Sequence, residues 1–174
     1  DRASGEHRAS ARHSVRPRAC GTSRRPPSAA GRRRQPLLLR VGAFYDAAPT
    51  GAQWGARCYR SLLAHYYNLL IPPDASVLEI GCGAGELLAQ IRAARKTGVD
   101  LSATQIEAAR RRLPDAAFFT QAGELLELEG KFDVIIVSDT LNLAADVQRL
   151  LERLQTVANA DTRLLVNFQN TLWR

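Results

Sequence analysis

The chain has 174 residues, of which 45% are hydrophobic, which is enough for one domain of ordinary size with a buried core. Its net charge of +7 is unevenly spread: residues 1–40 carry 11 Arg against Asp1 and Glu6, for +9, whereas residues 41–174 carry 13 Lys and Arg against 15 Asp and Glu, for −2. The positive charge therefore belongs to the first forty residues and does not indicate a nucleic-acid surface on the domain.

Residues 1–40 are rich in Arg, Ser, Ala, Pro and Gly, with almost no large apolar residue before Leu37. Such a segment cannot bury enough surface to offset its ordering entropy. We expect a disordered basic tail over 1–40 and a globular domain over 41–174. The basic cluster at 32–34 leaves open a role as an arm for an anionic partner.

Two classes of protein are disfavoured by what the sequence lacks. No window approaches the eighteen or so apolar residues of a membrane span, and no secretory segment is visible, so we expect a cytoplasmic protein without a span. The three cysteines, Cys20, Cys58 and Cys82, show no metal-ligand or disulfide spacing. We interpret them as free thiols and expect no metal site.

The globular part begins with a helix and a strand. Apolar residues at helical spacing predict a helix over 54–70, which the two prolines at 72 and 73 end. A strand over 75–80 follows, then a glycine-rich turn and a predicted helix over 86–94.

The remaining elements alternate in the same way. We predict strands over 97–101, 117–120, 132–138 and 162–168, and helices over 103–113 and 145–157, the first of them capped by Ser102 in an S-x-x-Q box. Continuous Val and Ile over 132–138 indicate a strand covered on both faces. The alternation predicts an α/β fold with a doubly wound, mostly parallel sheet.

The glycine-rich turn is the most informative segment. Gly81, Gly83 and Gly85 follow the apolar strand directly, so the backbone can turn tightly and approach a ligand. Asp100 ends the next strand, where its carboxylate can accept hydrogen bonds from ribose hydroxyls. A dinucleotide fingerprint would need glycine at 86, where the chain has Glu86, although a nicotinamide-binding Rossmann domain stays an alternative.

The segment 77–88 resembles motif I of the class I S-adenosylmethionine-dependent methyltransferases, and the resemblance covers about three quarters of the chain. It implies a Rossmann-like fold, an enzyme and S-adenosylmethionine as cofactor. It implies that Glu79 orients the loop, that the loop backbone meets the amino-acid end of the cofactor, and that Leu101 covers adenine beside Asp100; the implied loop residues are Gly81, Cys82, Gly83 and Gly85. Family members have seven strands and this chain supplies five, so we expect a sheet truncated after the fifth strand.

Other site residues follow from the same resemblance. The family usually has Asp after strand three, where this chain has Ala122, so adenine would rely on backbone near Ala122 and Gly123 or on Glu124. Ser138 and Asp139 follow strand four, and Asp139 is either a general base or a surface acid. The segment lacks the N-P-P-Y pattern of base or glutamine methyltransferases, which makes a nucleic-acid substrate unlikely.

The resemblance also has implications for the segment before the first helix and for the acceptor. Tyr45, before the first helix, would contact the carboxylate end of the cofactor. The stretch 44–173 looks like methyltransferase modules beside family-2 glycosyltransferases, which implies a small-molecule, sugar or lipid-linked glycan acceptor and a longer bifunctional chain. A binding module that keeps the fold without catalysing stays a further alternative.

Overall fold

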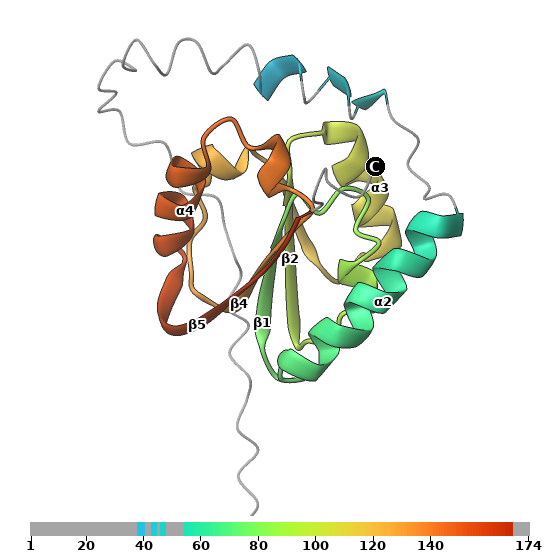
Figure 1. Ribbon diagram of the computed structural model, residues 1–174, viewed down its shortest axis with the longest axis vertical. Helices are drawn as coiled ribbons and strands as arrows, with labels where there is room; N and C mark the ends of the chain where they lie inside the picture. The colour runs from blue at the N-terminus through green and yellow to red at the C-terminus, as the bar shows by residue number, and fades with distance from the viewer. Residues whose placement is uncertain (1–37, 41–42, 45, 48–53, 169–174) are drawn as a thin grey trace, which may run out of the picture.

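The computed structural model describes residues 38–40, 43–44, 46–47 and 54–168. Five parallel strands form one sheet in the order β3-β2-β1-β4-β5, as Figure 1 shows. The strands are β1 (Ser76–Ile80), β2 (Arg95–Asp100), β3 (Ala117–Thr120), β4 (Phe132–Ser138) and β5 (Ala158–Asn167). The predicted α/β fold with a parallel, Rossmann-like sheet is confirmed.

Helices cover both faces of the sheet (Figure 1). On one face, residues of α2 (Trp54–Leu70) and α3 (Ala103–Arg112) share a hydrophobic cluster with β1 and β4. On the other face, Leu150 and Leu154 of α4 (Val147–Gln155) pack on Leu78, Ile80 and Ile135. The central strands are therefore buried on both sides, as the continuous apolar run in β4 predicted.

Side chains cap two of these helices. The hydroxyl of Ser102 accepts a hydrogen bond from the Gln105 amide at 3.2 Å, which confirms the predicted cap of α3. Asp146 accepts one from the Arg149 amide at 3.2 Å and caps α4. Each cap satisfies an amide that lacks a partner within the helix.

The predicted helix over 86–94 is wrong. The chain makes turns from Gly81 to Leu87 and then a single 3-10 turn, Leu88–Gln90. β2 begins already at Arg95, where the amides of Ala94 and Arg95 bond to the Ala75 carbonyl. Too few residues remain between the loop and this anchor for a full helix, and the apolar residues of the segment are buried by the turn instead.

The strand order places one end of β1 at the switch point of the sheet. β1 is central, with β2 on one side and β4 on the other, and ligands of open α/β sheets bind beyond the carboxyl ends at this position. The loops that follow β1 and β4 therefore face one site.

Of the predicted tail, the structure describes only residues 38–40, which form a helical turn. The rest of the tail lies outside the described residues, and the boundary at residue 41 stays a prediction. Within the described ranges, the helices are too short or too polar to cross a membrane.

Candidate functional site

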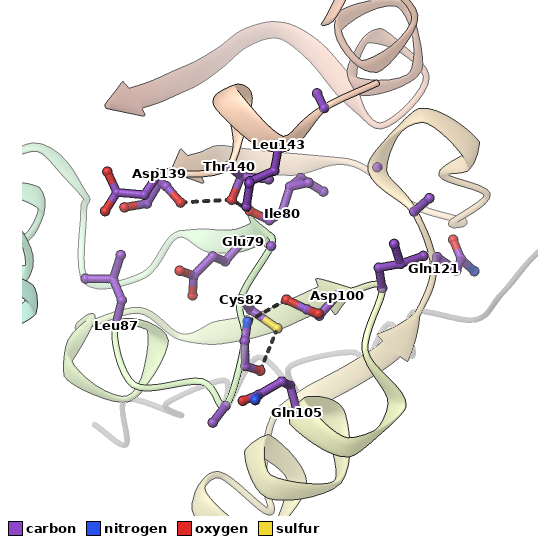
Figure 2. A pocket seen from close by; sticks show the side chains of 18 of the residues that line it. Glu79, Ile80, Cys82, Leu87, Asp100, Gln105, Gln121, Asp139, Thr140 and Leu143 are labelled. Carbon is purple, nitrogen blue, oxygen red and sulfur yellow. Dashed lines mark hydrogen bonds between the residues drawn. The ribbon is translucent and has the colours of Figure 1, made fainter. Parts of the chain in front are cut away.

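A cavity of about 350 Å³ opens at the carboxyl ends of β1, β2 and β4. Its volume lies in the range of small-molecule sites. Most residues that the sequence assigned to cofactor binding line it: Glu79, Gly81, Cys82, Gly83, Asp100, Leu101, Ala122, Gly123 and Ser138. Figure 2 shows Glu79 and Asp139 toward one side of the cavity and Asp100 and Gln121 toward the other. The fold thus gathers these residues, while their roles stay predictions.

Two assigned residues do not line the cavity. A side chain at Gly85 (φ +71°) would meet Ala109 Cβ at 3.3 Å and Phe118 Cζ at 3.5 Å. Gly85 therefore allows the loop to pack on α3 and β3, and it is not among the lining residues. Tyr45 lies outside the described residues.

The turn after β1 depends on Gly81. Its amide bonds to the Val99 carbonyl at 2.7 Å with φ at +73°, a conformation that disfavours any residue with a Cβ. A Cβ built there would lie 2.1 Å from Thr140 Oγ1. Thr140 is held in turn, because its hydroxyl shares its one proton between the carbonyls of Ser138 (2.9 Å) and Ile80 (3.2 Å). Gly81 thus lets the loops after β1 and β4 meet.

We expect Gly81→Ala to lower the free energy of unfolding by about 2–4 kcal/mol, because it combines a disfavoured φ with overpacking against Thr140. Gly83→Ala is the matched control: its φ is also positive, at +51°, but a Cβ there meets no atom within 4 Å. It should cost about 1–2 kcal/mol, from the backbone alone. Urea unfolding of both variants measures the difference, and equal losses would show that the contact with Thr140 is unimportant.

Asp100 ties the glycine loop to the start of α3. Oδ2 accepts the Gly83 amide at 2.8 Å, and Oδ1 accepts the Ser102 amide at 2.8 Å. Burial raises the pKa of this carboxyl, and the backbone hydrogen bonds oppose that rise. Each oxygen keeps lone-pair capacity for a further donor. Asp100 therefore positions the loop and still offers a carboxylate to the cavity.

Glu79 is buried at the end of β1, with 3% of its surface exposed. Its Oε2 has no hydrogen-bond partner among the described residues. Burial raises the pKa of Glu79 to about 8, and the charge of Arg60 opposes the rise. An unpartnered carboxyl oxygen beside a cavity is costly unless a ligand completes its hydrogen bonds. A cationic ligand group is the natural complement.

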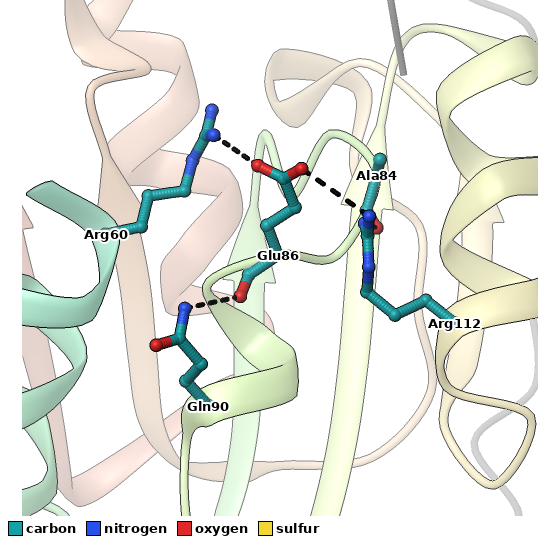
Figure 3. Close-up of polar contacts among 5 residues, drawn as sticks. All are labelled: Arg60, Ala84, Glu86, Gln90 and Arg112. Carbon is teal, nitrogen blue, oxygen red and sulfur yellow. Dashed lines mark hydrogen bonds and ion pairs between the residues drawn. The ribbon is translucent and has the colours of Figure 1, made fainter. Parts of the chain in front are cut away.

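The sequence did not point to Arg60, which also lines the cavity. It projects from α2 and forms an ion pair with Glu86 of the glycine loop, as Figure 3 shows. Arg112 of α3 approaches the other oxygen of Glu86 at 3.5 Å and bonds to the Ala84 carbonyl. These contacts clamp the loop between two helices. Arg60 is one of two arginines on α2, and its packing against the loop distinguishes it.

The predicted adenine end of the cavity is lined by both apolar and acidic side chains. Leu101, Ala122 and Leu143 supply apolar surface. The Glu124 carboxylate is already engaged, since its Oε1 accepts the Ala145 amide at 2.8 Å. Of the two options that the sequence left for adenine, Glu124 is thus the less available one.

Comparisons with known proteins agree with this geometry. The methyltransferase-domain family matches residues 78–164, from within β1 into β5. A trans-aconitate 2-methyltransferase of Deinococcus radiodurans is 37% identical over 102 residues, covering 55% of this chain and 39% of the relative. An uncharacterised protein of Rickettsia prowazekii is 31% identical over 128 residues, covering 66% of this chain and 51% of the relative. The chain thus spans about half or less of the length of these relatives.

Solved structures share the fold. Magnesium protoporphyrin IX methyltransferase of Synechocystis PCC 6803, with bound S-adenosylmethionine, superposes with a TM-score of 0.57 at 18% identity, covering 71% of this chain and 72% of that one. A TehB-like methyltransferase of Corynebacterium glutamicum gives 0.54 at 21% identity, covering 76% and 71%. Because the family match spans half of its residues, this chain belongs to the methyltransferase-domain family of class I S-adenosylmethionine-dependent methyltransferases.

Proposed function

We propose that this protein binds S-adenosylmethionine in the cavity and transfers its methyl group to an acceptor that enters beside Asp139. The observation that carries the proposal is the pair of carboxyl groups beneath the glycine loop. Asp100 is half-buried and held by two backbone amides, whereas the buried Oε2 of Glu79 has no partner among the described residues.

The lining fits this cofactor group by group. Glu79 would hold the α-ammonium, which supplies the cation that its buried carboxyl lacks. Asp100 would accept the ribose hydroxyls, and the apolar surface of Leu101, Ala122 and Leu143 would cover adenine. A nicotinamide dinucleotide brings ribose and adenine but no primary ammonium, so it would leave Glu79 unsatisfied.

The bound cofactor supplies a methyl group on a positively charged sulfur, ready for in-line displacement. The work of the chain is to fix the donor, align the acceptor and exclude water. The loops after β1 and β4 do this together, because Gly81 and Thr140 pack against each other between the two strands. Two loops packed in this way limit the directions from which an acceptor can approach.

For the acceptor we propose a small molecule, a sugar or a lipid-linked glycan. The sequence resemblance to modules beside family-2 glycosyltransferases supports the glycan, and with it a longer bifunctional chain. The acidic lining supports an acceptor without negative charge. Of its five carboxyl side chains, Glu86 is paired with Arg60 and Glu79 would be paired with the ammonium, which leaves Asp100, Glu124 and Asp139. The tricarboxylate named for the relative from Deinococcus radiodurans would be repelled by them.

Calorimetric titration of the 174-residue chain with S-adenosylmethionine, S-adenosylhomocysteine and NAD tests the proposal. Saturable binding of the first two, each of which carries the ammonium, without binding of NAD is the expected result. Preference for NAD would favour the nicotinamide alternative. A folded protein that binds none of the three would favour a binding module that has lost the cofactor.

A further inference from the structure

Four polar side chains that are distant in sequence meet at the rim of the cavity. The Asp139 cluster consists of Tyr59 and Tyr67 from α2, Asp139 after β4, and Asn167 at the end of β5. Asn167 Nδ2 donates to Asp139 Oδ1 and to the Tyr59 hydroxyl, both at 2.9 Å. Tyr67 donates to Asn167 Oδ1 at 2.8 Å, and Tyr59 donates to Asp139 Oδ1 at 3.3 Å.

Asp139 itself is held in a strained conformation. Among the described residues it is the non-glycine residue with positive φ, at 53°, which costs on the order of 1 kcal/mol. The amide of Asp139 bonds to the Asn167 carbonyl at 3.1 Å, so the backbone and side chain of one residue fix both ends of Asp139. Strain that the surroundings over-determine in this way is found at functional sites.

The hydrogen bonds leave one oxygen of Asp139 free. Both side-chain donors reach Oδ1, and none from the described residues reaches Oδ2. Asp139 lines the cavity on the same side as Glu79 in Figure 2. Burial raises the pKa of Asp139, against the hydrogen bond from Tyr59 and the charge of Arg60, which lower it. A carboxylate with one fixed and one open oxygen is suited to accept a proton from a bound ligand.

The charges around Asp139 narrow the class of acceptor. Arg60 is engaged with Glu86, so among the lining residues that the structure describes it offers an anionic acceptor little compensation for Asp100, Glu124 and Asp139. A neutral amine attacks a methyl sulfonium without first losing a proton, whereas a hydroxyl must lose its proton as it attacks. A positioned carboxylate that can accept a proton therefore favours a hydroxyl acceptor over a neutral amine or an anionic group.

We propose that Asp139 is the general base of the transfer and that the acceptor is an uncharged hydroxyl, with Tyr59 and Asn167 as positioning residues. This inference rests on the proposed function. In the step, the acceptor oxygen forms a bond to the methyl carbon while the carbon–sulfur bond breaks, and sulfur keeps the electron pair. The hydroxyl proton passes to Oδ2 of Asp139 and then to solvent when the methyl ether leaves.

Cofactor analogues test this without a known acceptor. In three probes, an amine nitrogen replaces the sulfur of S-adenosylhomocysteine and carries a 3-hydroxypropyl, butyl or 2-carboxyethyl arm. We expect the hydroxyl arm to bind about tenfold more tightly than the butyl arm, the ratio that a hydrogen bond to a charged acceptor gives. We expect the carboxylate arm to bind least tightly, because Asp139 repels it.

Asp139→Asn is the informative variant, because Asn tolerates positive φ and has the same shape. It should reduce the preference for the hydroxyl arm, because a neutral amide replaces the charged acceptor, and improve binding of the carboxylate arm, with the affinities for S-adenosylhomocysteine and the butyl probe unchanged. Tyr59→Phe should reduce the hydroxyl preference by less. Asp74→Asn, an exposed acid outside the cavity, is the control and should change nothing.

The outcomes separate the two proposals. If S-adenosylhomocysteine does not bind the wild-type protein, the proposed function fails and this inference with it. If it binds but the hydroxyl and butyl arms bind equally, or the carboxylate arm binds as tightly as the hydroxyl arm, only the assignment of Asp139 is overturned. A loss of all three probes in a folded Asp139→Asn variant would equally overturn it, since Asp139 would then act on the cofactor.

Discussion

Replacing Asp100 by alanine is expected to weaken binding of S-adenosylmethionine and S-adenosylhomocysteine by at least about a hundredfold. Hydrogen bonds to a charged acceptor contribute roughly 1.5–3 kcal/mol each, and two ribose hydroxyls would lose theirs together. The amides of Gly83 and Ser102 would lose their acceptor as well, so the loop that the cofactor must approach would be less ordered. Titration calorimetry measures the affinity.

Two further variants separate ligand contact from loop order. Asp100→Asn keeps one carbonyl oxygen but loses the charge and the second acceptor, so it should fall between wild type and Asp100→Ala. Asp74→Ala removes an exposed acid and should bind the cofactor like wild type. Thermal unfolding must show that each variant is folded. Tight cofactor binding by a folded Asp100→Ala variant would contradict the assignment.

The second large effect is a loss of stability with rising pH that depends on Glu79. The pKa of this buried carboxyl rises from its ordinary value of 4.5 to about 8 in the folded protein. Between these values the folded state binds a proton that the unfolded state has released, so stability is full below pH 4.5 and falls as pH rises through 8. Because one pKa unit corresponds to about 1.4 kcal/mol, the loss is on the order of 5 kcal/mol.

Glu79→Gln isolates this effect, because glutamine is neutral at every pH. Urea unfolding from pH 4.5 to 9 should show a smaller decline in the variant than in wild type. Burial also raises the pKa values of Asp100 and Asp139, which gives a decline of the same sign in both proteins. The difference between the two curves therefore reports Glu79, and a difference independent of pH would contradict its protonation in the folded state.

The same carboxyl links cofactor binding to proton release. The α-ammonium that Glu79 would hold favours the ionised form, so below pH 8 binding should expel a proton from Glu79. Calorimetry of S-adenosylmethionine binding at pH 7, repeated in buffers of different ionisation enthalpy, measures the number of protons released. Wild type should release close to one proton, and Glu79→Gln should release about one fewer.

The order of elements and the glycine loop followed from short stretches of sequence. Hydrophobic periodicity, the cap at Ser102 and the turn glycines act over a few residues. The failure at 86–94 shows the limit, because the periodicity there is compatible with a helix. The segment cannot continue as a helix because the Ala75 carbonyl, just before β1, bonds to the amides of Ala94 and Arg95 at the start of the neighbouring strand β2.

The candidate site divides in the same way. The sequence by itself determined the parallel fold and the neighbourhood of the glycine turn and Asp100, because strand, glycines and acid lie within the short segment from β1 to the end of β2, whose geometry is local. Only the tertiary structure decided the burial of Glu79 and the partners of Asp139, because burial and hydrogen bonding depend on segments far apart in the chain. Tyr59 and Asn167 are 108 residues apart, and no local pattern brings them together.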